Sequence, residues 1–175
     1  MAEYECFKKE AYNFKGKYAD YVDSIWEQNK IKADKSCFKR LVDLYAISAI
    51  VGLKTGNKAE DDNTGSDHKR TAPLEQMMTN YDILIDIMRL MILFDDSDGS
   101  TVEERIQAAF TIDAPVPEET YKKYMKLFNS YMLGGLEYIY NEVVIKPIGP
   151  DDHYFGRPGR MFSMLKNLSI ETGGM

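Results

Sequence analysis

The sequence contains one dense run of carboxylates, Asp95-Asp96-Ser97-Asp98-Gly99. Clustered acidic side chains ahead of a turn glycine could bind a hard cation such as calcium, because such ions prefer oxygen ligands. A calcium-binding loop with Gly99 at its sixth position would put Phe94 first and Arg105 twelfth, and neither side chain can supply a carboxylate. We therefore predict that the run is a solvated turn between two helices.

The other polar motifs do not form a catalytic pattern. The segment Lys54-Thr55-Gly56-Asn57-Lys58 lacks the first glycine of a phosphate-binding loop and follows a predicted helix instead of a strand. His68 and His153 lie in polar segments, and no Ser-His-Asp, Cys-His or paired-histidine spacing surrounds them. Cys6 and Cys37 lack the spacing of a redox or metal pair, and we interpret Cys37 as a structural thiol. We predict no catalytic residue, no metal site and no cofactor.

Two basic clusters are candidates for contact with an anionic partner. The first has a local charge of +4 within eleven residues and consists of Lys30, Lys32, Lys35, Lys39 and Arg40, opposed by Asp34. The second places Arg157 and Arg160 near Tyr154 and Phe155, a combination of guanidinium and aromatic groups that suits phosphates or bases. Solvated surface charge is the alternative interpretation of both clusters. Binding to nucleic acid would weaken steeply with salt.

Length and composition set the broad class. A chain of 175 residues with 44% apolar types is typical of a single globular domain, so we predict one helical domain over residues 1–175. The 22 basic and 28 acidic residues give a net charge of −6, which opposes non-specific attraction to a polyanion. No apolar run reaches about 18 residues and the N-terminus does not resemble a secretory signal, so we expect a cytoplasmic protein without membrane contact.

The spacing of apolar residues predicts an all-α, single-domain bundle of five to six helices. The predicted helices span 16–30, 37–53, 73–94, 101–110 and 117–145, and a short sixth helix could span 161–168. The 37–53 segment is apolar nearly all round, so we expect it at the centre with 73–94 and 117–145 packed along it. Gly134-Gly135 in the last long helix should mark a kink or a close helix contact.

The segments between these helices have their own signals. Residues 54–71, between the second and third helices, are almost entirely polar and are predicted to form a long mobile surface loop. Residues 147–175 are expected to form an irregular tail that contains the short helix. Ser100 and Glu103 have the spacing of a capping box, and Gly52 or Gly56 can end the second helix. The aromatic residues of the first fifteen positions fit a docked arm or a short helix.

Two stretches resemble a known group of proteins. Residues 38–56, Phe38-Lys39-Arg40-Leu41-Val42-Asp43-Leu44-Tyr45-Ala46-Ile47-Ser48-Ala49-Ile50-Val51-Gly52-Leu53-Lys54-Thr55-Gly56, and residues 131–140, Tyr131-Met132-Leu133-Gly134-Gly135-Leu136-Glu137-Tyr138-Ile139-Tyr140, resemble two helical stretches of small accessory proteins associated with bacterial DNA phosphorothioation systems. The resemblance implies a role in a phage-defence or DNA-modification gene cluster, and it brings no catalytic motif with it.

The surplus of 12 Tyr, 8 Phe and 10 Met residues has two interpretations. At helical spacing most of these residues are expected in the core, but Met and Tyr are also common where a helix face accepts a partner. The apolar stripes of the 73–94 and 117–145 helices are wide enough to favour a dimer or a complex. We predict a non-enzymatic accessory or adaptor subunit that works through protein–protein contacts, with a protein partner or a second copy. The alternative is a nucleic-acid-binding small subunit of a larger effector complex, in which the basic clusters line the path of the strand.

Overall fold

The computed structural model describes residues 1–26, 37–64, 67–146 and 152–170, the last range without the side chains of 152–155 and 170. These residues are mostly helical but also form two small two-stranded sheets, so the predicted all-α class is corrected to a mostly helical fold with β elements. The α-helices are α1 (Lys17–Ile25), α2 (Leu41–Thr55), α3 (Leu74–Thr79), α4 (Tyr81–Phe94), α5 (Val102–Ala109), α6 (Glu118–Tyr140) and α7 (Asp152–Ile170). A π-helical turn, η2 (Asn141–Ile145), follows α6.

The N-terminal segment is a docked arm and not a helix. Strand β1 (Glu3–Tyr4) pairs antiparallel with β4 (Val116–Pro117), and β2 (Tyr12–Lys15) pairs antiparallel with β3 (Lys69–Ala72). The buried ring of Phe7 meets Phe128 edge to face, with 4.8 Å between ring centroids. The spacing of apolar residues did not reveal these strands, because each strand is short and its backbone hydrogen-bonds to a distant part of the chain.

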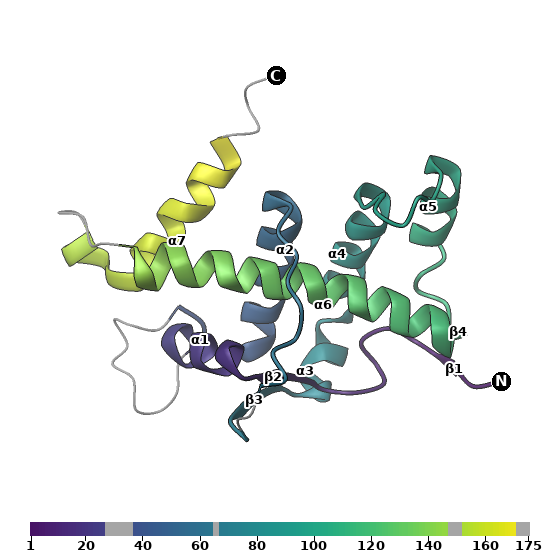
Figure 1. The fold of residues 1–175 in the computed structure, drawn as a ribbon, viewed down its shortest axis with the longest axis horizontal. Coiled ribbons are helices and arrows are strands. Elements are labelled where there is room, and N and C mark those ends of the chain that lie inside the picture. The colour runs from purple at the N-terminus through teal and green to yellow at the C-terminus, as the bar shows by residue number, and fades with distance from the viewer. Residues whose placement is uncertain (27–36, 65–66, 147–151, 171–175) are drawn as a thin grey trace.

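The contact between α2 and α6 is the structural centre of the molecule. Figure 1 shows α6 crossing the whole view with α2 packed across it. A Cβ on Gly135 would lie 1.7 Å from the carbonyl oxygen of Ser48, and one on Gly52 would lie 1.8 Å from that of Tyr131. Helix α6 continues unbroken through both of its glycines. The glycines therefore mark the close helix contact that the sequence predicted as one of two possibilities.

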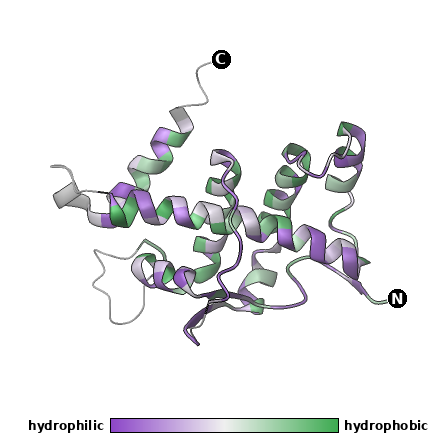
Figure 2. Cartoon of the chain, viewed as in Figure 1, coloured by the Kyte–Doolittle hydropathy of each residue, from purple (hydrophilic) through white to green (hydrophobic). Residues whose placement is uncertain are grey.

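The predicted central position of the second helix is confirmed. Eight of the fifteen residues of α2 are buried, and the Tyr45 ring stacks on Phe128 with 5.1 Å between centroids. The Tyr45 hydroxyl donates a hydrogen bond of 2.6 Å to Oδ1 of Asn129 on α6. Gly56 ends α2 in the left-handed conformation, with φ of 69°, so the second of the two predicted stops is the one used. Figure 2 shows much of the ribbon of α2 in the colour of hydrophobic residues.

The predicted 73–94 helix is wrong as a single helix. Asn80 leaves helical geometry, with φ of −106° and ψ of 21°, and separates α3 from α4. Its side-chain amide donates a 2.7 Å hydrogen bond to the Gln76 carbonyl, because a short amide competes with the backbone for local partners. Helix α4 then turns into α5 through residues 95–101. The two helices pack against each other as a hairpin at one end of the molecule (Figure 1).

The predicted 54–71 loop is shorter than expected, because regular structure extends into both of its ends. Hydrogen bonds hold its middle part to the rest of the protein. Lys54 and Thr55 complete α2, and residues 69–71 belong to β3. The Tyr12 hydroxyl donates to Asp61 (3.1 Å), and the backbone N–H of Lys17 donates to Asp62 (2.8 Å). Hydrogen bonds from polar side chains thus hold this segment against the rest of the protein, because the segment has too few apolar residues to be held by burial.

The C-terminal part is more regular than predicted. The 117–145 helix is α-helical to Tyr140 and continues as the π-helical turn η2. Helix α7 replaces most of the predicted irregular tail, with a break at Gly156, whose positive φ of 58° suits a residue without a Cβ. Pro158 follows this break and occupies the start of the second helical part, where its missing N–H has no helical partner to lose. Residues 147–151 and 171–175 of the predicted tail lie outside the described residues.

Candidate functional site

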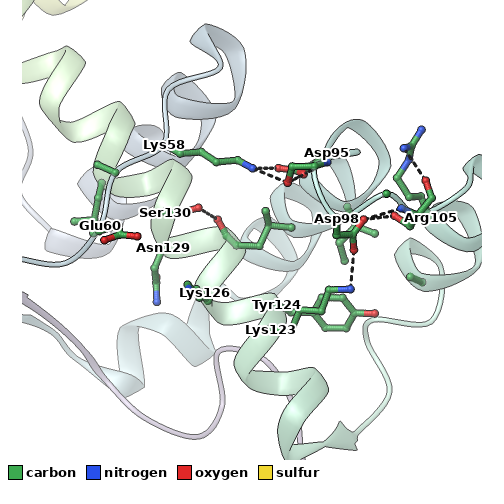
Figure 3. Close-up of a pocket in the computed structure, with 18 of the residues that line it drawn as sticks. Lys58, Glu60, Asp95, Asp98, Arg105, Lys123, Tyr124, Lys126, Asn129 and Ser130 are labelled. Carbon is green, nitrogen blue, oxygen red and sulfur yellow. Dashed lines mark hydrogen bonds and ion pairs between the residues drawn. The ribbon is translucent and has the colours of Figure 1, made fainter.

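A wide, open cleft of about 1400 Å³ lies between residues 58–63, the α4–α5 turn with the start of α5, and the middle of α6. Figure 3 shows its charged side chains arriving from all three segments. The polar residues that line it include Lys58, Glu60, Asp61, Asp95, Asp98, Arg105, Lys123, Lys126, Asn129 and Ser130. The sequence analysis did not group these residues, because they come from segments far apart in the chain.

Asp95 is the buried acid of the cleft, with its side chain only 5% exposed. Lys58 forms an ion pair with its carboxylate, the Tyr131 hydroxyl donates to Oδ2 (2.8 Å), and the Ser97 N–H donates to Oδ1 (2.9 Å). Burial alone would raise the pKa of Asp95, but the hydrogen bonds from Lys58, Ser97 and Tyr131 outweigh it and lower the pKa to about 2. Asp95 therefore stays ionised at neutral pH.

Asp98 forms the second charge pair of the cleft. Lys123 on α6 donates to Oδ2 at 2.7 Å, and the Ser100 N–H donates to Oδ1 at 3.0 Å. The Lys123 hydrogen bond and then the two from Ser100 lower the pKa of Asp98, and the same ion pair raises the pKa of Lys123. Asp95 and Asp98 thus act as hydrogen-bond acceptors and are not poised to transfer protons near neutral pH.

The carboxylate run forms the predicted turn between two helices, but the run is not solvated throughout, because Asp95 is buried. Asp95 and Asp98 each bond the backbone N–H two residues later, which is the geometry of an Asx turn. The predicted capping box is displaced by one residue, because Ser100 is held by Asp98. Thr101 accepts from the Glu104 N–H (3.2 Å), and Glu104 accepts from the Thr101 N–H (2.7 Å), which together start α5.

The rest of the cleft wall is also largely engaged within the protein. The Asn129 carbonyl oxygen accepts from Tyr45, which leaves the amide NH₂ group as a donor, and Arg105 donates to the Ser100 carbonyl at 3.2 Å. Lys126 is an exposed lysine of α6 on the cleft rim. Two ion pairs, Lys58–Asp95 and Lys123–Asp98, thus join charged residues of the cleft to one another. Asp61, Glu104 and Arg105 have other partners within the protein.

The first predicted basic cluster is only partly described. Lys30, Lys32 and Lys35 lie outside the described residues. Lys39 is exposed, and Arg40 is exposed and bonds Asp43 through both Nε (3.0 Å) and Nη2 (2.6 Å). The charge of Arg40 is thus directed back at its own helix.

The second predicted cluster has a structural role in the described residues. Arg157 donates to the backbone carbonyl of Ser24, and Arg160 donates to that of Val143 at 3.0 Å. Both arginines tie α7 to earlier parts of the chain. The segments that carry the two basic clusters meet at a groove of about 370 Å³ between α2 and α7. Its lining includes Cys37 and Phe38 from the first segment and Pro158 and Met161 from the second.

A third charged group joins α1 to β3 and was missed by sequence reasoning. His68 Nε2 lies 2.8 Å from Asp23 Oδ2 and 3.7 Å from Asp20 Oδ1, and Arg70 bonds Asp23 through Nε (2.6 Å) and Nη2 (3.0 Å). The imidazole and the two carboxylates are close enough to hold a metal ion. The two bonds from Arg70 occupy the Asp23 carboxylate, however, and the guanidinium charge opposes a cation there. Because the partners are more than forty positions apart, no local spacing could have revealed them.

Burial affects both thiols in the same direction. It raises the pKa of Cys6 to about 12 and that of Cys37 to about 11, the nearby Arg157 charge opposing the shift at Cys37. Both thiols are therefore protonated at neutral pH, which agrees with the interpretation of Cys37 as structural.

The outer face of the α4–α5 hairpin has the opposite character from the cleft. We define this outer face by six apolar side chains that are between 46% and 71% exposed. They are Ile83, Leu90 and Phe94 on α4, Val102 and Ile106 on α5, and Phe110 at the C-cap of α5. On α4 the three follow one helical stripe, and on α5 they recur at every fourth residue. The hairpin lines the cleft with Ile92, Arg105 and Ala108, so the stripes lie on the side turned away from the cleft.

Compared with known protein families, with curated proteins and with solved structures, the chain matches none. Among the described residues, no helix combines the length and the apolar character needed to cross a membrane.

Proposed function

We propose that this protein is a non-enzymatic adaptor that binds a partner protein through the outer face of the α4–α5 hairpin. The observation that carries the proposal is the exposure of six large apolar side chains on two neighbouring helices. Exposed apolar residues are common when they are scattered, but a grouped set on one face is typical of a contact surface. Their positions on a short, two-helix projection also leave them accessible to another protein.

The charges elsewhere support a binding role over a catalytic one. Three acids of the cleft, Asp95, Asp98 and Glu104, have lowered pKa values. Lysine partners contribute to the shift at Asp95 and Asp98, and hydrogen bonds from Thr101 cause it at Glu104. A general acid or base needs a pKa closer to neutral pH. An accessory role in a bacterial phage-defence or DNA-modification system remains part of the proposal through the sequence resemblance.

Reconstitution tests the adaptor function. We would co-express the full chain with each protein encoded by the adjacent genes and measure complex formation by size-exclusion chromatography with light scattering. The wild-type chain should form a complex with one of them, and the double variant Ile106→Ser/Phe110→Ser should not. Phe162→Ser is the matched control, because Phe162 is equally exposed but lies on α7. A complex that survives the hairpin substitutions, or no complex at all, would contradict the proposal.

The predicted alternative, a nucleic-acid-binding subunit, can be tested with the same material. Gel-shift assays with single- and double-stranded DNA and RNA at low salt would detect it. Binding that is lost on changing Lys39 to Ala would favour the alternative, because Lys39 is the exposed lysine that the structure describes in the first basic cluster.

A further inference from the structure

The outer face of the hairpin is apolar at its centre and acidic around it. Asp82 and Asp86 on α4, Glu103 on α5 and Asp113 after α5 are all exposed. Between residues 81 and 113 the sequence contains eight acidic and two basic residues, a charge of −6, while the whole chain also has a charge of −6. Three of these acids, Asp95, Asp98 and Glu104, line the cleft on the other side of the hairpin. The acidity of the outer face therefore comes from the four exposed acids named above.

The two basic residues of the hairpin are already engaged. Arg89 bonds Asp86 (2.5 Å) on its own helix and Asp113 (3.2 Å) beyond the end of α5, so it links the two helices beside the stripes. Arg105 lines the cleft on the opposite side. Neither arginine offsets the charge of Asp82 or Glu103, and an approaching partner therefore meets an acidic rim.

The shape of the stripes suits a helix as the bound element. Val102 and Phe110, the C-cap of α5, are eight residue steps apart, which is about 12 Å along the helix axis, or about two turns, and Ile106 lies midway. The α4 stripe runs alongside, because the two helices pack against each other. A partner helix lying along both would place apolar residues at three- and four-residue steps against the stripes, as in other helix-in-groove complexes.

We infer that the outer face binds a basic amphipathic helix of the partner protein, an inference that rests on the proposed adaptor function. Apolar side chains of that helix pack between the α4 and α5 stripes, and its lysine or arginine side chains meet Asp82, Glu103 and the neighbouring acids. Charge complementarity of this kind sets specificity and association rate. A second copy of this chain is disfavoured on the same ground, because it would bring two acidic rims together.

The test uses three synthetic peptides of about 18 residues, a length of about 27 Å when helical. The first is an amphipathic helix of leucine and lysine, the second has the same composition in an order that breaks the stripe, and the third has glutamate in place of lysine. Binding to the full chain is measured by fluorescence anisotropy. The lysine helix should bind, and affinity should fall as NaCl rises from about 50 to about 300 mM, since rim charges are screened.

Variants locate the binding. Ile106→Ser/Phe110→Ser should weaken the lysine peptide at least about tenfold, as expected for loss of central apolar anchors. Asp82→Asn/Glu103→Gln should weaken it about threefold to fivefold through loss of rim charge. The matched control, Glu3→Gln/Glu119→Gln, removes the same net charge from exposed positions on β1 and α6 and should leave the affinity unchanged. Circular dichroism confirms that each variant is folded.

The outcomes separate this inference from the adaptor function. If the glutamate helix binds as tightly as the lysine helix, or the scrambled peptide does, the inferred partner chemistry is wrong, while reconstitution of a complex would still support the adaptor. If the hairpin variants leave lysine-peptide binding unchanged, the site is wrong. A dimer of the free chain that Ile106→Ser/Phe110→Ser dissociates would assign the face to a second copy and overturn the inference.

Discussion

The cleft and the outer face lie on opposite sides of the same α4–α5 hairpin and differ in how their side chains are satisfied. In the cleft, Asp95 and Asp98 each pair with a lysine from another segment, so the charges hold the hairpin to the rest of the molecule. On the outer face, Phe94 and Phe110 are 71% and 67% exposed. The cleft is a large cavity, whereas the outer face is a surface whose apolar side chains remain available for contact with another molecule. A cavity lined by charged residues can thus be part of the fold, and an exposed apolar face is the site that we propose for a partner.

The largest expected effect comes from the helix contact that positions both regions. Gly135→Ala should destabilise the protein by about 4 kcal/mol or more, because the new Cβ would meet the Ser48 carbonyl oxygen and cannot be accommodated without separating α2 from α6. Urea denaturation followed by circular dichroism measures this loss. Gly99→Ala is the control: it has a positive φ of 76° but open space around it, and should cost only about 1 kcal/mol. Equal losses would mean that the α2–α6 contact is not closely packed.

The second prediction tests whether the cleft charges are structural. Asp95→Asn should lower the free energy of unfolding by about 2–3 kcal/mol at pH 7, because the pKa of Asp95 is lowered from its usual value near 4 to about 2. A lowered folded-state pKa stabilises the protein above the unfolded-state value, and this stabilisation is lost as the pH falls through about 2. The difference between wild type and variant should therefore shrink between about pH 4 and pH 2.

Asp96→Asn is the control for this experiment. Asp96 is exposed beside Asp95, and its substitution should change stability by less than about 0.5 kcal/mol at any pH. If the two variants lose the same stability, or if the Asp95 difference does not depend on pH, the Lys58–Asp95 pair contributes nothing to folding.

The third prediction concerns Arg160, which was predicted to bind an anionic partner but instead bonds a backbone carbonyl of the protein. Arg160→Ala should destabilise by about 1–2 kcal/mol, because it leaves the buried Val143 carbonyl without its donor. Lys39→Ala should be neutral within about 0.5 kcal/mol, as expected for an exposed lysine. Thermal unfolding of the two variants side by side measures the contrast, and a neutral Arg160→Ala would return this arginine to the candidates for binding.

The smallest stability effect is expected on the outer face. Ile106→Ser/Phe110→Ser should change the free energy of unfolding by less than about 0.5 kcal/mol, because both side chains are already exposed in the folded state. The same change is predicted above to abolish partner binding. Denaturation of this variant thus separates the two regions: a loss comparable to that of Asp95→Asn would show that the stripes stabilise the fold, which would weaken the case for a docking surface.

The sequence predicted those parts of the fold that rest on local pattern. The apolar period located the cores of α2, α4 and α6, and the glycine pair located the close contact between α2 and α6. Prediction from sequence failed where a single polar residue interrupts a regular spacing of apolar residues, as Asn80 does when it divides the predicted third helix. It also failed for β1 to β4, whose partners lie far away in the chain.

Prediction of the site was weaker, because charge in a sequence does not say where its partner is. Arg157 and Arg160 looked like an anion-binding pair, but both donate to backbone carbonyls. Lys58 and Asp95 looked unrelated, but they meet in the cleft. The wide apolar stripe of the predicted 73–94 helix agrees with the exposed apolar residues of α4, whereas the partner itself stays a prediction. The exposed residues of α5 could have been suspected from Val102, Ile106 and Phe110, which recur at every fourth position of the predicted 101–110 helix.

The central claim is tested most directly by methyl NMR of the full chain during titration with the lysine amphipathic peptide. The account predicts that the methyl signals of Ile83, Leu90 and Ile106 shift on binding, while those of Leu127 and Leu133, which line the cleft, stay in place. Shifts confined to Leu127 and Leu133 would show that the cleft is the binding surface and would contradict the account.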